Sequence, residues 1–175
     1  MTDVLQELCD RQAITEAIYR YCRGLDRMDA EMARAVWHPD GTADYGELFN
    51  GTADGFIQWV WQAHAAMDRH SHQVTNILIE IDGDAAVSES YVTVALRTKP
   101  IDGAAVEIED RGRYLDRWSR RDGRWAIDHR RFVDDLLRVH DAPPLDADGR
   151  PGESRRNRDD PSYEVLADQS DEYGR

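Results

Sequence analysis

Residues 70–98, HSHQVTNILIEIDGDAAVSESYVTVALRT, decide the fold class. Residues 70–81 and 85–98 are rich in β-branched side chains and alternate between apolar and polar positions, and this period of two is typical of strands. Asp82-Gly83-Asp84 lies between them and predicts a hairpin turn, because Asp and Gly tolerate the backbone angles of tight turns. This stretch therefore predicts two long antiparallel strands.

The sequence before this hairpin has the period of a helix instead. Residues 3–27 place apolar side chains at three- and four-residue steps, which predicts an amphipathic helix. The other predicted elements are helices at 29–37, capped by Asp29, and from Thr52 to about Met67, and strands at 42–46, 105–119 and 124–136. Helices followed by long antiparallel strands predict an α+β domain with the helices on one face of a curved sheet.

The composition changes near the C-terminus. The chain has 175 residues, enough for one domain of roughly 150 residues and an additional arm. We place the domain at residues 1–140 and the arm at 141–175, because the arm is charged and contains few large apolar side chains. Its candidate anchors, on this protomer or a neighbouring one, are Tyr163, Val165, Leu166 and Tyr173.

The charge balance excludes some partners. Lys and Arg total 22 against 35 Asp and Glu, so the net charge of −13 disfavours nucleic acid and anionic lipid. No apolar run approaches the roughly 18–20 residues of a membrane span, and the opening MTDVLQELCD lacks a secretion pattern. We expect a soluble cytoplasmic protein. Cys9 and Cys22 fall about 20 Å apart on one predicted helix, so we expect no disulfide between them.

Two residues stand out as candidates for chemistry. Asp26 shares the apolar face of the first predicted helix, which is costly for a carboxylate unless it is paired or used. It is either solvated at a frayed helix end, a cap for the next helix, or a carboxylate that projects into the concave side of the sheet. His72 opens a predicted strand, and His70 lies on the same face two residues earlier.

A His-x-His pair also raises the question of a metal. Metal sites need three or four ligands, and the spacing provides no third ligand, since His64 lies on a predicted helix. We therefore expect hydrogen-bonded histidines and no metal. Tyr21 precedes Asp26 by five residues on the same helix, and its hydroxyl can donate a hydrogen bond to a substrate oxygen.

Several strings in this chain resemble the nuclear transport factor 2-like superfamily, in its SnoaL-like branch. The resemblance covers about residues 5–138. The strings are AITEAIYRYCRGLDRMD, VWHPDGTADY, HSHQVTNILIEIDGDAAVSESYV and GRYLDRWSRRDGRWAIDHRRF. It implies a cone-shaped α+β barrel, a fold that carries many activities.

Within this superfamily the chain is similar to scytalone dehydratase, bile acid 7α-dehydratase and hexachlorocyclohexane dehydrochlorinase. Asp26 and His72 match the Asp-His dyad of these enzymes, and Tyr21 matches a tyrosine of the bile acid enzyme. Tyr45 and Arg130 lie near further cavity positions, although a one-residue shift would select Arg131 instead of Arg130. Candidate pocket walls are Trp37, Phe56, Trp59, Val74, Tyr91 and Phe132.

The resemblance implies a lyase or isomerase, dehydratase-like, that needs no cofactor and acts on a hydrophobic ring-containing molecule. His72 would be the general base or acid, and Asp26 would orient its ring. It also implies a homo-oligomer, with a trimer favoured over a dimer, and Trp118 and Trp125 are candidates for an interface on the outer sheet face.

Three other functions remain open. One is a domain that binds a small molecule without turnover, and a second is an assembly subunit like the small subunit of ring-hydroxylating dioxygenases. The third is polyketide cyclisation or epoxide opening in the same cone.

Overall fold

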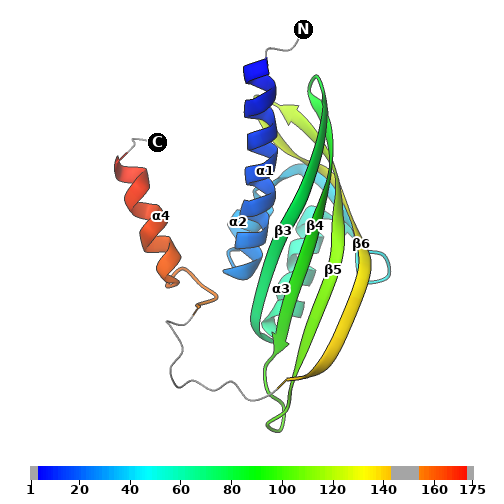
Figure 1. The fold of residues 1–175 in the computed structure, drawn as a ribbon, viewed down its shortest axis with the longest axis vertical. Coiled ribbons are helices and arrows are strands. Elements are labelled where there is room, and N and C mark those ends of the chain that lie inside the picture. The colour runs from blue at the N-terminus through cyan, green and yellow to red at the C-terminus, as the bar shows by residue number, and fades with distance from the viewer. Residues whose placement is uncertain (1–3, 143–153, 173–175) are drawn as a thin grey trace.

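The computed structural model describes residues 4–142 and 154–172 (Figure 1). The elements are α1 (Val4–Asp26), α2 (Ala30–Arg34), β1 (Trp37–Asp44), β2 (Asn50–Thr52), α3 (Ala53–Ala65), β3 (Met67–Asp82), β4 (Ala85–Thr98), β5 (Ala105–Arg121), β6 (Arg124–Ala142) and α4 (Pro161–Glu172). They form one six-stranded sheet of order β2-β1-β6-β5-β4-β3. The pairings are antiparallel except for β1 with β6, which run parallel. The predicted α+β class is confirmed.

Capping residues set two of the helix starts. The Asp29 side chain accepts a hydrogen bond from the Met32 backbone N–H, and Thr52 accepts one from Gly55, as the N-cap assignments predicted. The second helix is shorter than predicted and ends at Arg34. Trp37 instead begins β1, where it pairs with Ile127, so tertiary pairing overrides the local helical pattern.

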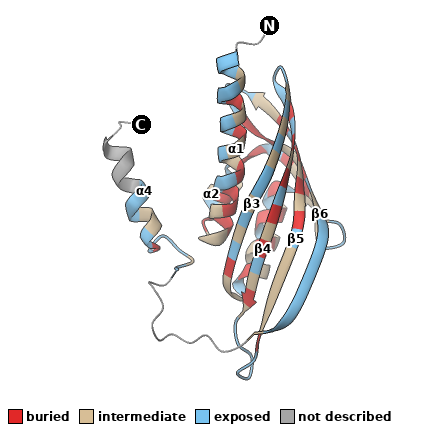
Figure 2. Ribbon diagram, viewed as in Figure 1, coloured by how far each residue is buried: buried red, intermediate tan, exposed pale blue. Residues whose placement is uncertain are grey.

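The long strands separate an inner from an outer side-chain face. In β4 the side chains of Ala86, Ser88, Ser90, Val92 and Val94 are buried, and the positions between them face outward. Helices α1 and α3 lie along the inner, concave face, and Figure 2 shows the buried residues gathered between these helices and the sheet. The core is therefore sandwiched between one sheet face and the helices.

The assignment of inner and outer faces of the sheet shows that the predictions for three residues were wrong. Tyr91 is 43% exposed on the outer face, so it cannot line an inner pocket. Trp118 and Trp125 point inward and are buried, because they continue the inward alternation of their strands. Their indole N–H groups donate to Ser88 Oγ and to an Asp10 oxygen, so neither residue forms an outer interface.

The described part of the arm packs against its own protomer. Tyr163 donates from its hydroxyl to Asp29 at 3.0 Å, and Arg23 donates to Ser162 at 3.0 Å. Val165 and Leu166 are 66% and 54% exposed, so they do not act as anchors here. Tyr173, the fourth candidate, lies outside the described residues.

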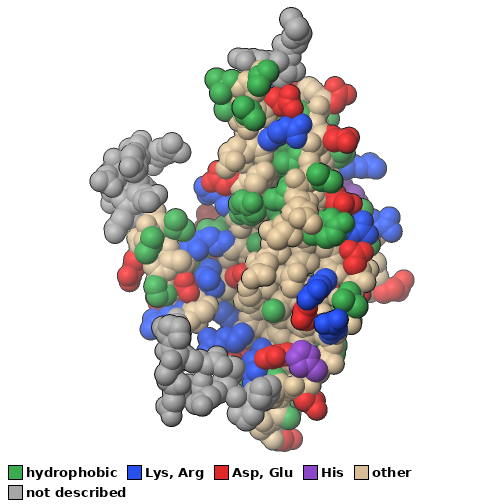
Figure 3. Space-filling view, viewed as in Figure 1, with side chains coloured by type: hydrophobic (Ala, Val, Ile, Leu, Met, Phe, Trp, Pro, Cys, Tyr) green, Lys and Arg blue, Asp and Glu red, His purple; other side chains and the backbone are tan. Residues whose placement is uncertain are grey.

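The surface carries both signs of charge. Figure 3 shows acidic and basic side chains interspersed over the face in view, without a continuous basic stripe there. Among the described helices, none has the length and apolar character needed to cross a membrane.

Candidate active site

The last residue of α1 meets the first half of β3. Asp26 Oδ1 lies 2.7 Å from His72 Nδ1, and Asp26 Oδ2 accepts a hydrogen bond from the His72 backbone N–H at 3.0 Å. The side chains are 15% and 4% exposed. The backbone contact anchors the carboxylate to the same residue whose ring it orients, so the geometry of the pair is fixed at two points.

The protonation state follows from these contacts. Burial raises the pKa of Asp26, but its contacts with the nearby His70 and with the hydrogen-bonded His72 outweigh burial and bring the pKa to about 2. An ionised carboxylate only accepts, so His72 carries a proton on Nδ1. Within the described residues His72 Nε2 has no hydrogen-bond partner, which leaves its lone pair available to take a proton.

Two further histidines surround the pair. The His64 and His70 ring centroids are 4.6 Å apart, and the His64 and His72 centroids are 6.0 Å apart. Burial, together with the neighbouring His70, His72 and Arg156, lowers the pKa of His64 to about 3. Burial also lowers the pKa of His70, although Asp26 opposes this effect. The cluster therefore keeps His64 and His70 neutral near pH 7.

Asp26, His70 and His72 also offer the donor set of a metal site. One ligand atom from each lies within 4.8 Å of the others, so the fold supplies the third ligand that sequence spacing did not reveal. However, Arg156 donates from Nε to His70 Nε2 at 2.7 Å. Arginine only donates, so His70 must keep its proton on Nδ1, the atom that would have to bind the metal. The residues fit a hydrogen-bonded cluster better than a metal centre.

A second polar group lies deeper in the core. The hydroxyls of Tyr21 and Tyr45 are 3.1 Å apart. Arg130 donates to both oxygens of Asp116 at 2.7 Å, and its guanidinium carbon lies 4.3 Å from the centroid of the Tyr21 ring. Burial raises the pKa of Tyr21 to about 12, against the effect of Arg130, so Tyr21 remains a neutral hydroxyl.

These contacts decide between the two candidate arginines. Arg130 faces inward and is fully buried, whereas the Arg131 side chain is 64% exposed and lies 3.8 Å from Asp44. Arg130 is held by Asp116 and packs on aromatic rings, so its visible role is to support the tyrosines. Among the described residues, no hydrogen bond, ion pair or ring contact joins Tyr21 to the Asp26–His72 pair.

The aromatic candidates form one cluster beside the tyrosines. The Tyr45 ring stacks on Phe56 at 4.5 Å and on Phe132 at 5.3 Å between centroids, and Trp59 lies 5.8 Å from Phe56. Trp37 is 1% exposed and contacts the Tyr21 and Phe56 rings. Trp37 and Phe56 are thus core residues, whereas Trp59 and Phe132 remain partly accessible.

Two clefts lie beside Asp26, and one of them also reaches His72. One, of about 280 Å³, is lined by both residues together with Tyr19, Cys22, Arg23, Arg27 and Val74. The other, of about 740 Å³, is lined by Asp26 and His70 and by charged, polar and apolar side chains of β3, β4 and β5. Each wall is mixed in character, so the predicted apolar lining is not found at these two clefts.

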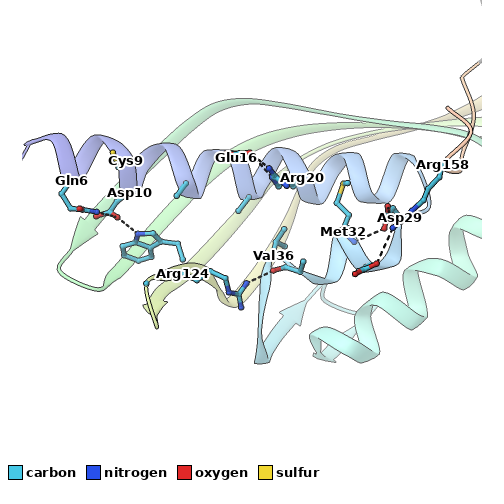
Figure 4. Close-up of a pocket in the computed structure, with 16 residues that line it drawn as sticks. Gln6, Cys9, Asp10, Glu16, Arg20, Asp29, Met32, Val36, Arg124 and Arg158 are labelled. Carbon is cyan, nitrogen blue, oxygen red and sulfur yellow. Dashed lines mark hydrogen bonds and ion pairs between the residues drawn. The ribbon is translucent and has the colours of Figure 1, made fainter. Parts of the chain in front are cut away.

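A third groove lies away from the pair. It measures about 890 Å³ and runs between α1, α2 and the β5–β6 turn (Figure 4). Asp10 on its wall accepts from Gln6, Arg120 and the Trp125 indole, which ties α1 to β6. Nothing in the sequence reading predicted this groove.

Sequence reasoning missed Asp116 and Arg156, and it set His64 aside because that residue lies on a predicted helix. Asp116 had a usable signal, because it stands between Tyr114 and Trp118 on an inward-facing row. His64 had no local signal, since only the packing of α3 brings it to β3. Arg156 had none either, because the arm reads as solvated and its path cannot be read from composition.

The comparisons with known proteins identify the family and the fold. Residues 6–131 match the model of the SnoaL-like domain. The chain belongs to the SnoaL-like family. Because the match spans most of the chain, the expected superfamily is confirmed.

Solved structures with the same fold include enzymes. A scytalone dehydratase-like protein from Novosphingobium aromaticivorans is 20% identical, with a TM-score of 0.67 over 83% of this chain and 97% of that one. A type 2 hexachlorocyclohexane dehydrochlorinase is 17% identical, with a TM-score of 0.74 over 84% and 99%. A protein of unknown function from Mycobacterium tuberculosis is 25% identical, with a TM-score of 0.65 over 77% of each chain. A search of curated proteins gives no match.

Proposed function

We propose that this SnoaL-like protein is a lyase or isomerase that acts on a hydrophobic, ring-containing small molecule and needs no cofactor. The observation that carries the proposal is the Asp26–His72 pair. Asp26 holds His72 at 2.7 Å with its proton on Nδ1, and Nε2 is left without a partner. A neutral imidazole oriented by a buried carboxylate is the arrangement that general acid–base catalysis uses.

The proposed reaction moves one proton through His72. Nε2 takes a proton from the carbon next to a carbonyl, and the electrons of that C–H bond form a double bond. In a dehydration, the bond to a hydroxyl on the adjacent carbon breaks, and His72 returns its proton to the departing hydroxide, which leaves as water. In an isomerisation, the proton returns to another carbon. Asp26 stabilises the imidazolium between the two steps.

The Tyr21–Tyr45 pair is the proposed donor to the substrate oxygen. Charge develops on a carbonyl oxygen as the proton leaves, and a fixed hydroxyl donor favours that charge. Tyr21 stays protonated, and Arg130 beneath it makes its surroundings more positive. Trp59 and Phe132, beside Tyr45, suit a flat apolar ring. The dehydratase-like and dehydrochlorinase neighbours support the same reaction class.

Binding without turnover is the second candidate. The mixed charged and apolar lining of the 740 Å³ cleft favours it, because a cleft of this size and character can hold a small molecule without any catalytic group. Catalysis requires His72, whereas binding without turnover should persist when His72 is replaced.

Hydrogen exchange in D₂O tests the proposal without a known substrate. The protein is incubated with a panel of cyclic ketones and β-hydroxy ketones, and deuterium at the carbon next to the carbonyl is measured by mass spectrometry. We expect exchange with wild-type protein and a loss of about 10²–10⁴-fold in His72→Gln and Asp26→Asn.

His129→Gln is the matched control, because His129 on β6 contacts Thr42 and lines neither of the two clefts beside the pair, and it should retain full exchange. Exchange that survives His72→Gln in a folded protein would overturn the proposal. Ligand binding detected by calorimetry, without exchange and unchanged in His72→Gln, would establish the binding function instead.

Members of the family often oligomerise, and we propose that this chain does so through the outer sheet face. Leu78, Val87 and Tyr91 are 65%, 48% and 43% exposed there. This assignment replaces the two tryptophans that the sequence had suggested.

A further inference from the structure

The arm brings a guanidinium to the histidine cluster. Arg156 donates from Nε to His70 Nε2 at 2.7 Å and from Nη2 to the His64 carbonyl at 2.6 Å, and Nη1 contacts the Met67 carbonyl. The acceptors belong to the end of α3 and to the first residues of β3. One side chain therefore joins the C-terminus of a helix, the start of the site's strand and a histidine of the cluster.

The contact with His70 fixes where its proton lies. Arg156 has no lone pair to offer, so His70 Nε2 must be unprotonated to accept its hydrogen bond. The single proton of neutral His70 is then on Nδ1, which lies 3.5 Å from Asp26 Oδ1. Arg156 thus turns the N–H side of the His70 ring toward the carboxylate that holds His72, at contact distance and not in a hydrogen bond.

We propose that Arg156 is a positioning residue of the site, which holds His70 neutral with its Nδ1–H, and not a lone pair, turned toward the Asp26 carboxylate that orients His72. The proposal rests on the function proposed above for the Asp26–His72 pair. It makes the arm a component of the site and not a solvated tail.

The charges around His70 show why an arginine matters here. His70 faces Asp26 from α1 and His72 on its own strand, His64 from α3 and Arg156 from the arm, while Asp68 and Arg69 lie near the guanidinium. Asp26 attracts a proton to His70, and Arg156 repels it. Without Arg156, neutral His70 could carry its proton on Nε2 and turn the Nδ1 lone pair toward the Asp26 carboxylate, which would repel it.

The arm is attached independently of this contact. Arg27 lies 3.4 Å from Asp160, Arg69 donates to the Ser154 carbonyl at 2.9 Å, and Tyr163 bonds Asp29. A change at Arg156 alone should therefore leave the segment in place. This makes point substitutions in the full-length protein a clean test.

Nitrogen-15 NMR of the histidine rings reads the proton position directly, with no substrate. At neutral pH we expect His70 to be a single Nδ1–H form in the wild type. Arg156→Ala should give a mixture with the Nε2–H form, and Arg156→Lys should restore most of the Nδ1–H form, since an ammonium also only donates. Arg155→Ala, which removes an exposed neighbouring arginine, should change nothing.

A second pair of variants, at His70 itself, separates the effect of the hydrogen-bonding pattern from the effect of misfolding. In His70→Gln the amide oxygen can accept from Arg156 while the amide N–H faces Asp26, so deuterium exchange should be largely retained, whereas His70→Leu should lose it. A His70 ring whose Nδ1–H form persists in folded Arg156→Ala would overturn the inference. Because the NMR readout needs no turnover, it can succeed even if the exchange panel shows that the proposed function is wrong.

Discussion

At the scale of single residues, the buried ion pair of Arg130 with Asp116 stands out, because removing two charges from water costs free energy. Both side chains are fully excluded from solvent, and two hydrogen bonds of 2.7 Å join them. Three aromatic rings, those of Tyr21, Trp37 and Tyr114, surround the guanidinium. Such a pair is tolerated only because each charge compensates the other.

Breaking this pair from one side should be strongly destabilising. Arg130→Met leaves Asp116 buried without its partner, so we expect a loss of about 3–5 kcal/mol in the free energy of unfolding. Urea denaturation followed by circular dichroism measures it. Arg131→Met, on the exposed side of the same strand, should change stability by less than about 0.5 kcal/mol. Equal effects of the two substitutions would contradict the assignment of inner and outer faces.

A sequence can single out a candidate residue where one element carries the signal. Asp26 is a carboxylate on the apolar face of its predicted helix, and His72 is an ionisable residue at the start of a predicted strand. Both features can be recognised from the sequence alone. The choice between Arg130 and Arg131 was open, because a β-bulge near Asp128 shifts the register of β6 against β5. The face to which a residue beyond a bulge points depends on strand pairing, which the local sequence does not encode.

At the scale of elements, the crossing of α1 and α2 depends on a glycine. A Cβ at Gly24 would lie 2.6 Å from the Ala33 backbone nitrogen and 2.9 Å from its Cα. The close approach lets Asp29 cap α2 and brings the end of α1, with Asp26, over β3. The small residue therefore places the carboxylate of the candidate site.

Gly24→Ala should consequently destabilise the protein, although alanine favours a helix by about 1 kcal/mol over glycine. The overlap with backbone atoms of Ala33 cannot be relieved by a rotamer change, and we expect a net loss of about 1–3 kcal/mol. Thermal unfolding measures the sign. Gln12→Ala, at an exposed position of α1, serves as the control and should leave stability nearly unchanged. A more stable Gly24→Ala would show that α1 and α2 do not approach so closely.

Element boundaries were predictable where side-chain alternation is regular. The strand at residues 85–98 is observed as Ala85–Thr98, because alternation and the Asp-Gly turn agree. β2 was missed, since three residues carry no period, and its only pairing is with β1. Helix α4 was missed because the composition of the arm masks a short helical pattern.

At the scale of the whole molecule, stability should fall in acid. The pKa of His64 is about 3 when folded, against an ordinary value of 6.5, so the unfolded chain binds a proton at His64 between these values and the folded chain does not. Stability therefore decreases as pH falls from about 6.5 toward 3. Asp26 acts in the same direction at lower pH, because its contribution is lost as pH falls from 3.8 through about 2.

His64→Gln should flatten this dependence. Between pH 6 and 4 we expect the slope of unfolding free energy against pH to fall by up to about 1.4 kcal/mol per pH unit, the value for one proton. The His64 carbonyl that accepts from Arg156 is retained in this variant. Denaturation series at several pH values give the slope, with His140→Gln as the exposed control. An unchanged slope would mean that His64 is not buried in the cluster.

At this scale the sheet and its helices were predictable, but the path of the arm was not. The curved sheet with helices on its inner face follows from the order of elements, and the family resemblance reinforced it. The path of the arm does not, because Arg156 lies 86 residues from the histidine it contacts. Contacts between charged side chains far apart in the chain produce no periodic sequence pattern, so they cannot be predicted from one.

The central claim is that Asp26 holds His72 with its proton on Nδ1 and its Nε2 free. Nitrogen-15 NMR of the imidazole of His72 at neutral pH, in wild type and in Asp26→Asn, tests it most directly. The account predicts a single Nδ1–H form in the wild type and a mixture of forms in Asp26→Asn, whose amide can either donate or accept. A wild-type His72 with its proton on Nε2, or a spectrum that Asp26→Asn leaves unchanged, would contradict the account.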